Sequence, residues 1–192
     1  DYKPKGARRA FPAALCVSIN DEIVHGIPNE AEKVLNQGDI VSLDLSLTHK
    51  GLITDAAITV PVGVIDDESE KLLAVTQLAL KVGIEAAVPG NTIGDIGEAI
   101  SNVVETSRFS LADDLVGHGV GYAVHEDPYV PNVGVAGKGE KLVPGLVIAI
   151  EPMASIGSRI AIERDDGTYV TKDGSKAAHF EHTVYIKRGG CE

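Results

Sequence analysis

The strongest constraint on the fold is a run from Ile40 to Leu47 in which polar and apolar side chains alternate. Alternation with period two predicts a half-buried strand, and it places Asp44 on the polar face. A short turn around residues 48–51 leads into a second strand-like run, Leu52 to Val60. Together the two runs predict a β-hairpin.

The register of this hairpin brings two acidic side chains together. If His49 and Lys50 form the turn, Asp44 lies directly opposite Asp55, with Cβ atoms about 4.5–5.5 Å apart. Carboxylates so placed repel each other, and the apolar neighbours limit screening by water. The pair must therefore either share a proton or bind a cation.

The order of the remaining elements indicates the fold class. Capping residues, helical periodicity and Gly-Pro punctuation predict two helices after the hairpin and a long loop region before the last strands. The arrangement predicts an α+β domain with a mainly antiparallel sheet that helices cover on one side. The expected elements outside the first hairpin are a strand at 15–19, helices at 67–87 and from 91 or 92 to about 106, a loop region at 117–144, strands at 146–151 and 180–187, and a hairpin around 165–167.

Composition excludes several classes of protein. The length of 192 residues suits one domain, in which a basic opening segment, residues 1–10, is expected to be an exposed arm or a cut loop. A formal net charge of -11 argues against a general nucleic-acid binder. The chain has no apolar run of about 20 residues, so no membrane partner is expected. Cys16 and Cys191 lie far apart without motif spacing, which fits a reducing cytoplasm.

Three further residues favour the cation over the shared proton. Glu151 and Glu181 occur in apolar strand patterns where an unpaired carboxylate is costly to bury, and His118 stands between two glycines. Four carboxylates and one imidazole suit Mn, Co, Fe or Zn and are numerous enough for two ions. Each residue taken alone could instead be a solvated acid or a loop histidine. The hypothesis of a catalytic pair of metal ions therefore rests on all five potential ligands taken together.

Five ordered sequence blocks resemble the signature blocks of bacterial-type methionine aminopeptidases. The resemblance implies the pita-bread fold and a site with two divalent metal ions. By position it implies that Asp44, Asp55, His118, Glu151 and Glu181 are the ligands, with Asp55 and Glu181 as bridges. The blocks are VSINDEIVHGIP (17–28), GDIVSLDLSLTHKGLITDAA (38–57), GHGVGYAVHEDPYV (117–130), LVPGLVIAIEPM (142–153) and DGSKAAHFEHTV (173–184).

The resemblance also implies catalytic roles for His25, His125 and Glu151. Metal binding lowers the pKa of water to about 7, so hydroxide is available to attack the first peptide bond. His125 is expected to donate a hydrogen bond to the oxyanion, His25 to position the scissile amide, and Glu151 to relay the proton to the leaving amine.

The resemblance also implies a pocket for the methionine side chain, although several of its residues depart from the family pattern. The expected lining residues are Phe11, Cys16, His25, Val124 and Tyr169. Val124 and Tyr169 stand where the family commonly has larger aromatic residues, and His179 replaces a frequent Gln. No functional role is expected from the pattern for His49, His179 or His182.

Two other functions remain open from the sequence. An Xaa-Pro aminopeptidase or dipeptidase of the same superfamily shares the five ligands, and a pita-bread module without metals would bind peptides without cleaving them. Expected partners are N-terminal Met peptides and nascent chains. The usual N-terminal segment of the family has no counterpart here, which predicts either a companion fragment or self-association.

Overall fold

The computed structural model describes residue 3 and residues 9–192. Its largest sheet, within this part of the chain, has the order β1-β3-β4-β13-β8-β6-β7, with β14 paired to β13. Every pairing in it is antiparallel. The strands are β1 (Cys16–Ile19), β3 (Ile40–His49), β4 (Leu52–Pro61), β6 (Gly117–Gly119), β7 (Glu126–Val130), β8 (Val147–Ile150), β13 (Glu181–Lys187) and β14 (Gly190–Cys191).

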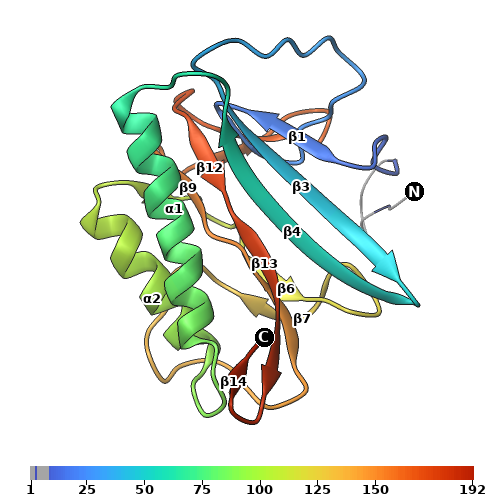
Figure 1. Cartoon of the computed structure of the whole chain (residues 1–192), viewed down its shortest axis with the longest axis vertical. Coiled ribbons are helices and arrows are strands. Elements are labelled where there is room, and N and C mark those ends of the chain that lie inside the picture. Colours follow the sequence, from blue (N-terminus) through green and yellow to red (C-terminus); the bar gives the residue numbers. More distant parts are fainter. Residues whose placement is uncertain (1–2, 4–8) are drawn as a thin grey trace.

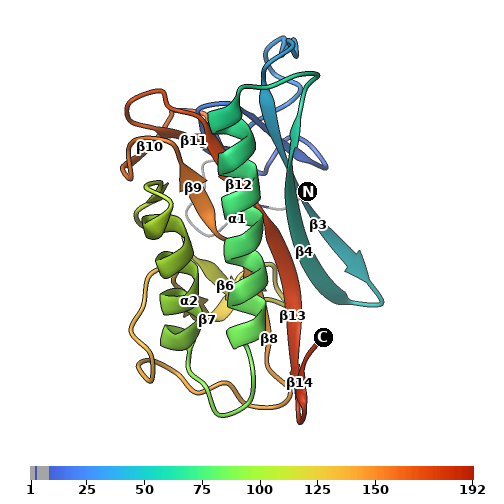
Figure 2. The same ribbon diagram turned by 60° about the vertical axis from the view of Figure 1, so that its left-hand side comes forward.

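Two helices lie along one face of this sheet, as the element order predicts (Figures 1 and 2). Helix α1 (Asp67–Ala86) begins at Asp66, whose side chain accepts a hydrogen bond from the Ser69 amide at 2.7 Å. That bond and the Lys176 ammonium lower the pKa of Asp66 to about 2. Helix α2 (Ile93–Thr106) begins with a capping box between Thr92 and Asp95.

The main hydrophobic core fills the space between these helices and the sheet. Most of its fully buried side chains come from α1, α2, β8 and β13, so the apolar faces of these four elements meet there. The opposite face of the sheet is left for polar side chains. Representative core residues are Leu72, Ile96, Ile100, Ile148, Ile150 and Ile186.

Two small antiparallel sheets complete the described part. One has the order β10-β11-β2 and includes the expected hairpin around 165–167, and the other has the order β12-β9-β5. Their strands are β2 (Glu22–Val24), β5 (Ser110–Leu111), β9 (Met153–Ser155), β10 (Ala161–Glu163), β11 (Tyr169–Thr171) and β12 (Ala177–His179).

The register predicted for the first hairpin is wrong by two residues. The turn is formed by Lys50 and Gly51, whose φ values are 50° and 81°. A two-residue hairpin turn of this kind needs positive φ at both positions, and glycine supplies one of them at no steric cost. Asp55 therefore pairs with Ser46 and not with Asp44.

The segment expected to be one long loop, 117–144, contains β6 and β7. These strands have three and five residues, too few for a period to show in a glycine-rich sequence. The expected N-terminal arm falls mostly outside the described residues. Of those described there, Lys3 and Arg9 are exposed, and Arg9 forms an ion pair with Glu30.

No helix in the described part of the chain is long and apolar enough to cross a membrane.

Candidate metal centre

Five neighbouring strands bring the expected ligands to one place on the face away from the helices. Their spatial order is β3, β4, β13, β8 and β6, and each strand carries or directly precedes one ligand. All five ligands line a cavity of about 160 Å³. The residues are Asp44 on β3, Asp55 on β4, Glu181 on β13, Glu151 directly after β8, and His118 on β6.

Small side chains in the sheet make room for the charged ones. Ala57 on β4 pairs with Asp44 on β3 and with Glu181 on β13. The two acids therefore lie on the same face of the sheet, and only the methyl group of Ala57 stands between them. In the adjacent row Ala149 pairs with His118 and Thr183. Larger residues at Ala57 and Ala149 would fill the space in which the carboxylates and the imidazole converge.

The orientation of His118 leaves one ring nitrogen for a cation. Its Nδ1 lies 2.9 Å from the Gly119 carbonyl oxygen. Because a carbonyl oxygen only accepts, Nδ1 carries the proton and Nε2 presents a lone pair. That Nε2 lies 3.3 Å from Oε1 of Glu151. Two acceptors facing each other at this distance fit a cation held between them.

The glycines that flank His118 allow neighbouring backbone to approach. A Cβ atom on Gly117 would lie 2.3 Å from the Ala149 carbonyl oxygen, and one on Gly119 would lie 2.2 Å from the Asp127 carbonyl oxygen. The crowding therefore comes from strands β8 and β7. This packing fixes the position of the His118 backbone.

Ionisation is unfavourable for two acidic residues of the cavity, Asp55 and Glu181. Burial and the Asp44 charge raise the pKa of Asp55 to about 6. Burial, together with the Glu151 and Asp55 charges, raises the pKa of Glu181 well above its usual value. Oε1 of Glu181 is buried without a hydrogen-bond partner. A divalent cation would relieve the repulsion and coordinate this oxygen, so the donor set fits a metal.

Two groups of donors converge closely enough to hold ions. In the described part of the chain they are Asp55, His118 and Glu181, and Glu151, His179 and Glu181, each group with its donor atoms within 4.8 Å of one another. Glu181 belongs to both groups. A carboxylate shared in this way has an oxygen for each of two neighbouring ions.

The two expected catalytic histidines line the same cavity. The rings of His125 and His118 meet edge to face, with centroids 4.3 Å apart. Desolvation lowers the pKa of His25 and of His125, and the neighbouring His118 lowers that of His125 further. Both imidazoles are therefore neutral near pH 7, a state in which each can donate one hydrogen bond and accept another.

The expected pocket residues lie at different distances from this cavity. Cys16 pairs with Asp44 across β1 and β3, and burial together with the Asp44 charge raises the pKa of its thiol. Tyr169 packs edge to face on His25, with ring centroids 5.8 Å apart. Val124 is buried and Phe11 is half-buried. Of the five, His25 alone is among the described residues that line the cavity, so the roles of the others stay predictions.

Several cavity residues were not expected from the sequence. Val24, Asp114, Leu115, Val116 and Met153 contribute to its walls. His179 also lies at the site, with Nε2 3.3 Å from Oε2 of Glu151. The spacing of two residues between His179 and Glu181 was a usable signal, since alternate residues of an extended chain share a face.

A larger cavity, of about 650 Å³, lies between β4 and α1 on the opposite face. Its walls are mainly apolar and include Ile58, Leu73 and Phe180. Since it lacks the converging carboxylates and imidazoles, the smaller cavity is the candidate site.

A curved antiparallel sheet that gathers buried carboxylates and imidazoles around a small open cavity defines a metal-dependent hydrolase. Residues 2–188 match metallopeptidase family M24, nearly the whole chain. The chain belongs to this family.

Its relatives include methionine aminopeptidases. The enzyme of Aquifex aeolicus is 49% identical, over 98% of this chain and 74% of the relative. The crystal structure of the Thermotoga maritima enzyme has a TM-score of 0.90 at 46% identity and covers 93% of this chain and 72% of that one. This match shows that the fold is the expected pita-bread fold.

A prolidase structure from Pyrococcus furiosus has a TM-score of 0.73 at 22% identity, covering 94% of this chain and 48% of that one. That likeness shows the fold alone.

Proposed function

We propose that the chain is a methionine aminopeptidase, which hydrolyses the peptide bond after an N-terminal methionine. The observation that carries this proposal is the convergence of four carboxylates and the free Nε2 of His118 on one cavity. Membership of family M24 and close similarity to proteins named methionine aminopeptidases support the choice of reaction.

Two divalent ions, chosen from Mn, Co, Fe and Zn, would be held by Asp44, Asp55, His118, Glu151 and Glu181. Asp55 and Glu181 would help to hold both ions. When bound, such ions lower the pKa of water and polarise the scissile carbonyl. The free α-amine of the substrate would bind one of the ions held by these residues, and that contact would confine cleavage to the N-terminus.

The neighbouring side chains would handle protons and orient the peptide. His125, on the rim of the cavity, would donate a hydrogen bond to the carbonyl oxygen as negative charge develops. His25 would hold the scissile amide, and Glu151 would pass a proton to the departing amine.

The methionine side chain would contact Phe11, Cys16, His25, Val124 and Tyr169. A soft thiol and aromatic rings suit a thioether. We further propose that residues 1–192 act as a single catalytic domain, in the cytoplasm, on nascent chains. Both cysteines are free in the structure, as a reducing compartment requires.

The test is cleavage of a Met-Ala peptide beside an Ala-Pro peptide, with chelator-treated protein to which Mn, Co, Fe or Zn is returned. We expect metal-dependent release of methionine and no cleavage before proline. Preferred cleavage of Ala-Pro would identify an Xaa-Pro peptidase. Peptide binding without cleavage under every metal would identify a non-catalytic module.

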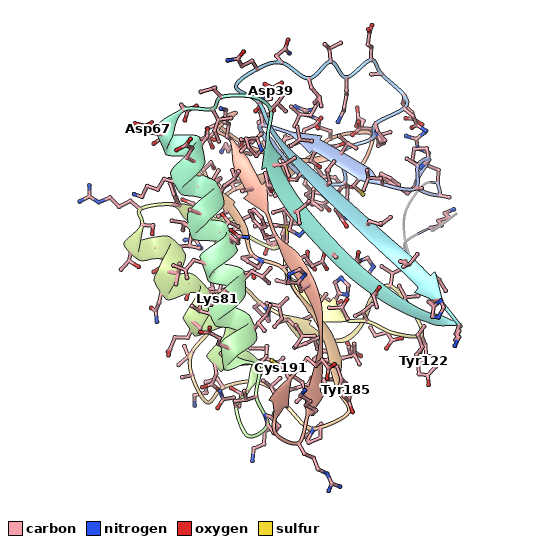
Figure 3. The ribbon with its side chains drawn as sticks, viewed as in Figure 1. Asp39, Asp67, Lys81, Tyr122, Tyr185 and Cys191 are labelled. Atoms are coloured by element: carbon pink, nitrogen blue, oxygen red, sulfur yellow. The ribbon has the colours of Figure 1, made fainter. Side chains whose placement is uncertain are left out.

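A pair of variants ties this activity to the ligands. Asp44→Asn should lower the rate by orders of magnitude, since it removes a charged donor from the cavity. Asp39→Asn is the matched control, because Asp39 directly precedes the same strand but does not line the cavity. It lies toward Asp67 and the start of α1 (Figure 3). Similar losses in both folded variants would contradict the metal hypothesis.

A further inference from the structure

His179 is a buried polar side chain for which the five-ligand site has no use. It is 1% exposed, and neither Nδ1 nor Nε2 has a hydrogen-bond partner in the described part of the molecule. Buried imidazole nitrogens are normally satisfied by a donor, an acceptor or a metal. Its Nε2 lies beside the cluster of carboxylates described above.

The backbone on both sides of this imidazole is held firmly. The His179 amide donates to Oγ1 of Thr59, and the same hydroxyl donates to the His179 carbonyl oxygen, both at 2.8 Å. Thr59 also bonds Oγ of Ser42 at 2.8 Å. Strand β12 is therefore attached to β3 and β4, the strands that carry Asp44 and Asp55.

The ring of His179 reaches two of the proposed metal ligands. Its Nε2 lies 3.3 Å from Oε2 of Glu151 and 4.0 Å from Oε2 of Glu181. The other oxygen of Glu151 faces His118. The carboxylate of Glu151 thus lies between two imidazoles, one at each oxygen.

We propose that His179 is a metal ligand, which binds one of the two ions through Nε2 together with Glu151 and Glu181. The inference rests on the proposed function, because it assigns a further residue to the same metal centre. It adds a second imidazole, so that each ion has one nitrogen ligand: His118 for the first and His179 for the second.

The distance between Nε2 of His179 and Oε2 of Glu151 fits two ligands of a common ion. Two ligand atoms about 2.0–2.2 Å from a common ion at a near-tetrahedral angle lie about 3.3 Å apart, the separation found between Nε2 and Glu151. Nε2 and this carboxylate oxygen are close neighbours, and an ion between them would be in contact with both. An ion placed among Glu151, His179 and Glu181 would also coordinate buried carboxylate oxygens that repel one another.

The experiment measures metal binding by the full chain, independently of catalysis. Metal-free wild-type, His179→Ala, His179→Gln and His182→Ala proteins are titrated with Zn²⁺ by calorimetry and with Co²⁺ by visible absorption. His182 is the matched control, since it neighbours Glu181 in sequence but is exposed. Circular dichroism confirms the fold of each variant, and His179→Gln, which keeps a polar side chain of similar length, is the variant to read if His179→Ala unfolds.

We expect wild type and His182→Ala to bind two ions. Both His179 variants should bind one ion as before and the second at least about tenfold more weakly. Loss of a residue that supports a ligand typically lowers metal affinity by this factor, and loss of the ligand itself should lower it at least as much. The Co²⁺ spectrum should change as well.

Unchanged binding in both His179 variants would overturn the inference while leaving the proposed function intact, provided that the wild type still cleaves Met peptides. Normal affinity in His179→Gln alone would also overturn it, because it would show that a hydrogen-bond donor is enough. A wild type that binds no ion would overturn both this inference and the proposed function.

Discussion

Two acidic residues of the candidate metal centre lie where an isolated carboxylate would be unfavourable. Asp55 is 7% exposed and Glu181 is 2% exposed, yet the described residues place no Lys or Arg side chain in the lining of their cavity. Ser46 donates a hydrogen bond to Asp55 at 3.1 Å, which offsets only part of the cost. The charge at this site is therefore a functional feature that the fold tolerates and that a cation would neutralise.

The raised pKa of Asp55 predicts how the stability of the metal-free protein depends on pH. Folding raises this pKa from 3.8 to about 6, so the folded state binds more protons than the unfolded state between these values. The free energy of unfolding should therefore fall as pH rises from about 4 to about 6, by up to roughly 3 kcal/mol for this residue. Urea unfolding in the presence of chelator measures it.

Asp55→Asn is the control for this prediction, since it removes the titrating group and should flatten the pH dependence. Saturating divalent metal should reverse the trend, because protons compete with the ion for the same oxygens. A metal-free wild type whose stability rises over the same interval would contradict the prediction.

Strand β6 shows how an element positions one of the proposed ligands. It has only three residues, and it lies between β7 and β8 with His118 at its centre. The flanking glycines are needed because the neighbouring backbone approaches within the distance that a Cβ atom would occupy. The position of His118 is thus fixed by close contact with β7 on one side and β8 on the other.

Gly117→Ala should therefore damage both stability and metal binding. The added methyl would overlap the Ala149 carbonyl oxygen, and forced overpacking typically costs about 1–3 kcal/mol. Thermal unfolding and Zn²⁺ calorimetry measure the two effects. Gly189→Ala is the matched control, since its Cβ would meet nothing within 4 Å, and it should change neither. Equal behaviour of the two variants would show that the close approach is unimportant.

At the scale of the whole molecule, the helices cover only half of the main sheet. Helix α1 lies along β13, whereas no described helix lies along β3 and β4 (Figure 2). The pairing register places Leu45 and Leu47 on the face opposite Asp44, where they are 45% and 59% exposed. Leu52 and Ile58 are exposed on the same face. Contiguous apolar surface of this kind usually marks an interaction site.

We expect the 192-residue chain to self-associate through this face. Sedimentation velocity should show species larger than a monomer whose fraction grows with concentration. The double variant Leu45→Gln and Leu47→Gln should remain monomeric with its metal affinity unchanged, because both residues lie on the face away from the cavity. Leu78→Gln, on the exposed side of α1, is the control and should still associate. A wild type that is monomeric at every concentration would contradict this expectation.

Much of the candidate site could be predicted from local patterns in the sequence. The predicted hairpin placed Asp44 and Asp55 on one face, and this part of the prediction survived the error in the turn because a shift of two residues preserves the face of every side chain. Helix boundaries followed from capping residues and from Pro-Gly punctuation, which act over a few neighbouring residues. The resemblance of five ordered sequence blocks to known signature blocks was enough to predict the family and the fold.

Only the tertiary structure decided which distant residues meet. The pairing of β13 between β4 and β8 brings Glu181 beside Asp55 and Glu151, and the attachment of β12 to Thr59 brings His179 to Glu151. The sequence by itself determined which side chains could bind a cation and which face of each strand they occupy, because both depend on residue type and local periodicity. Their convergence depends on strand order and close backbone packing, which arise from contacts between segments far apart in the chain.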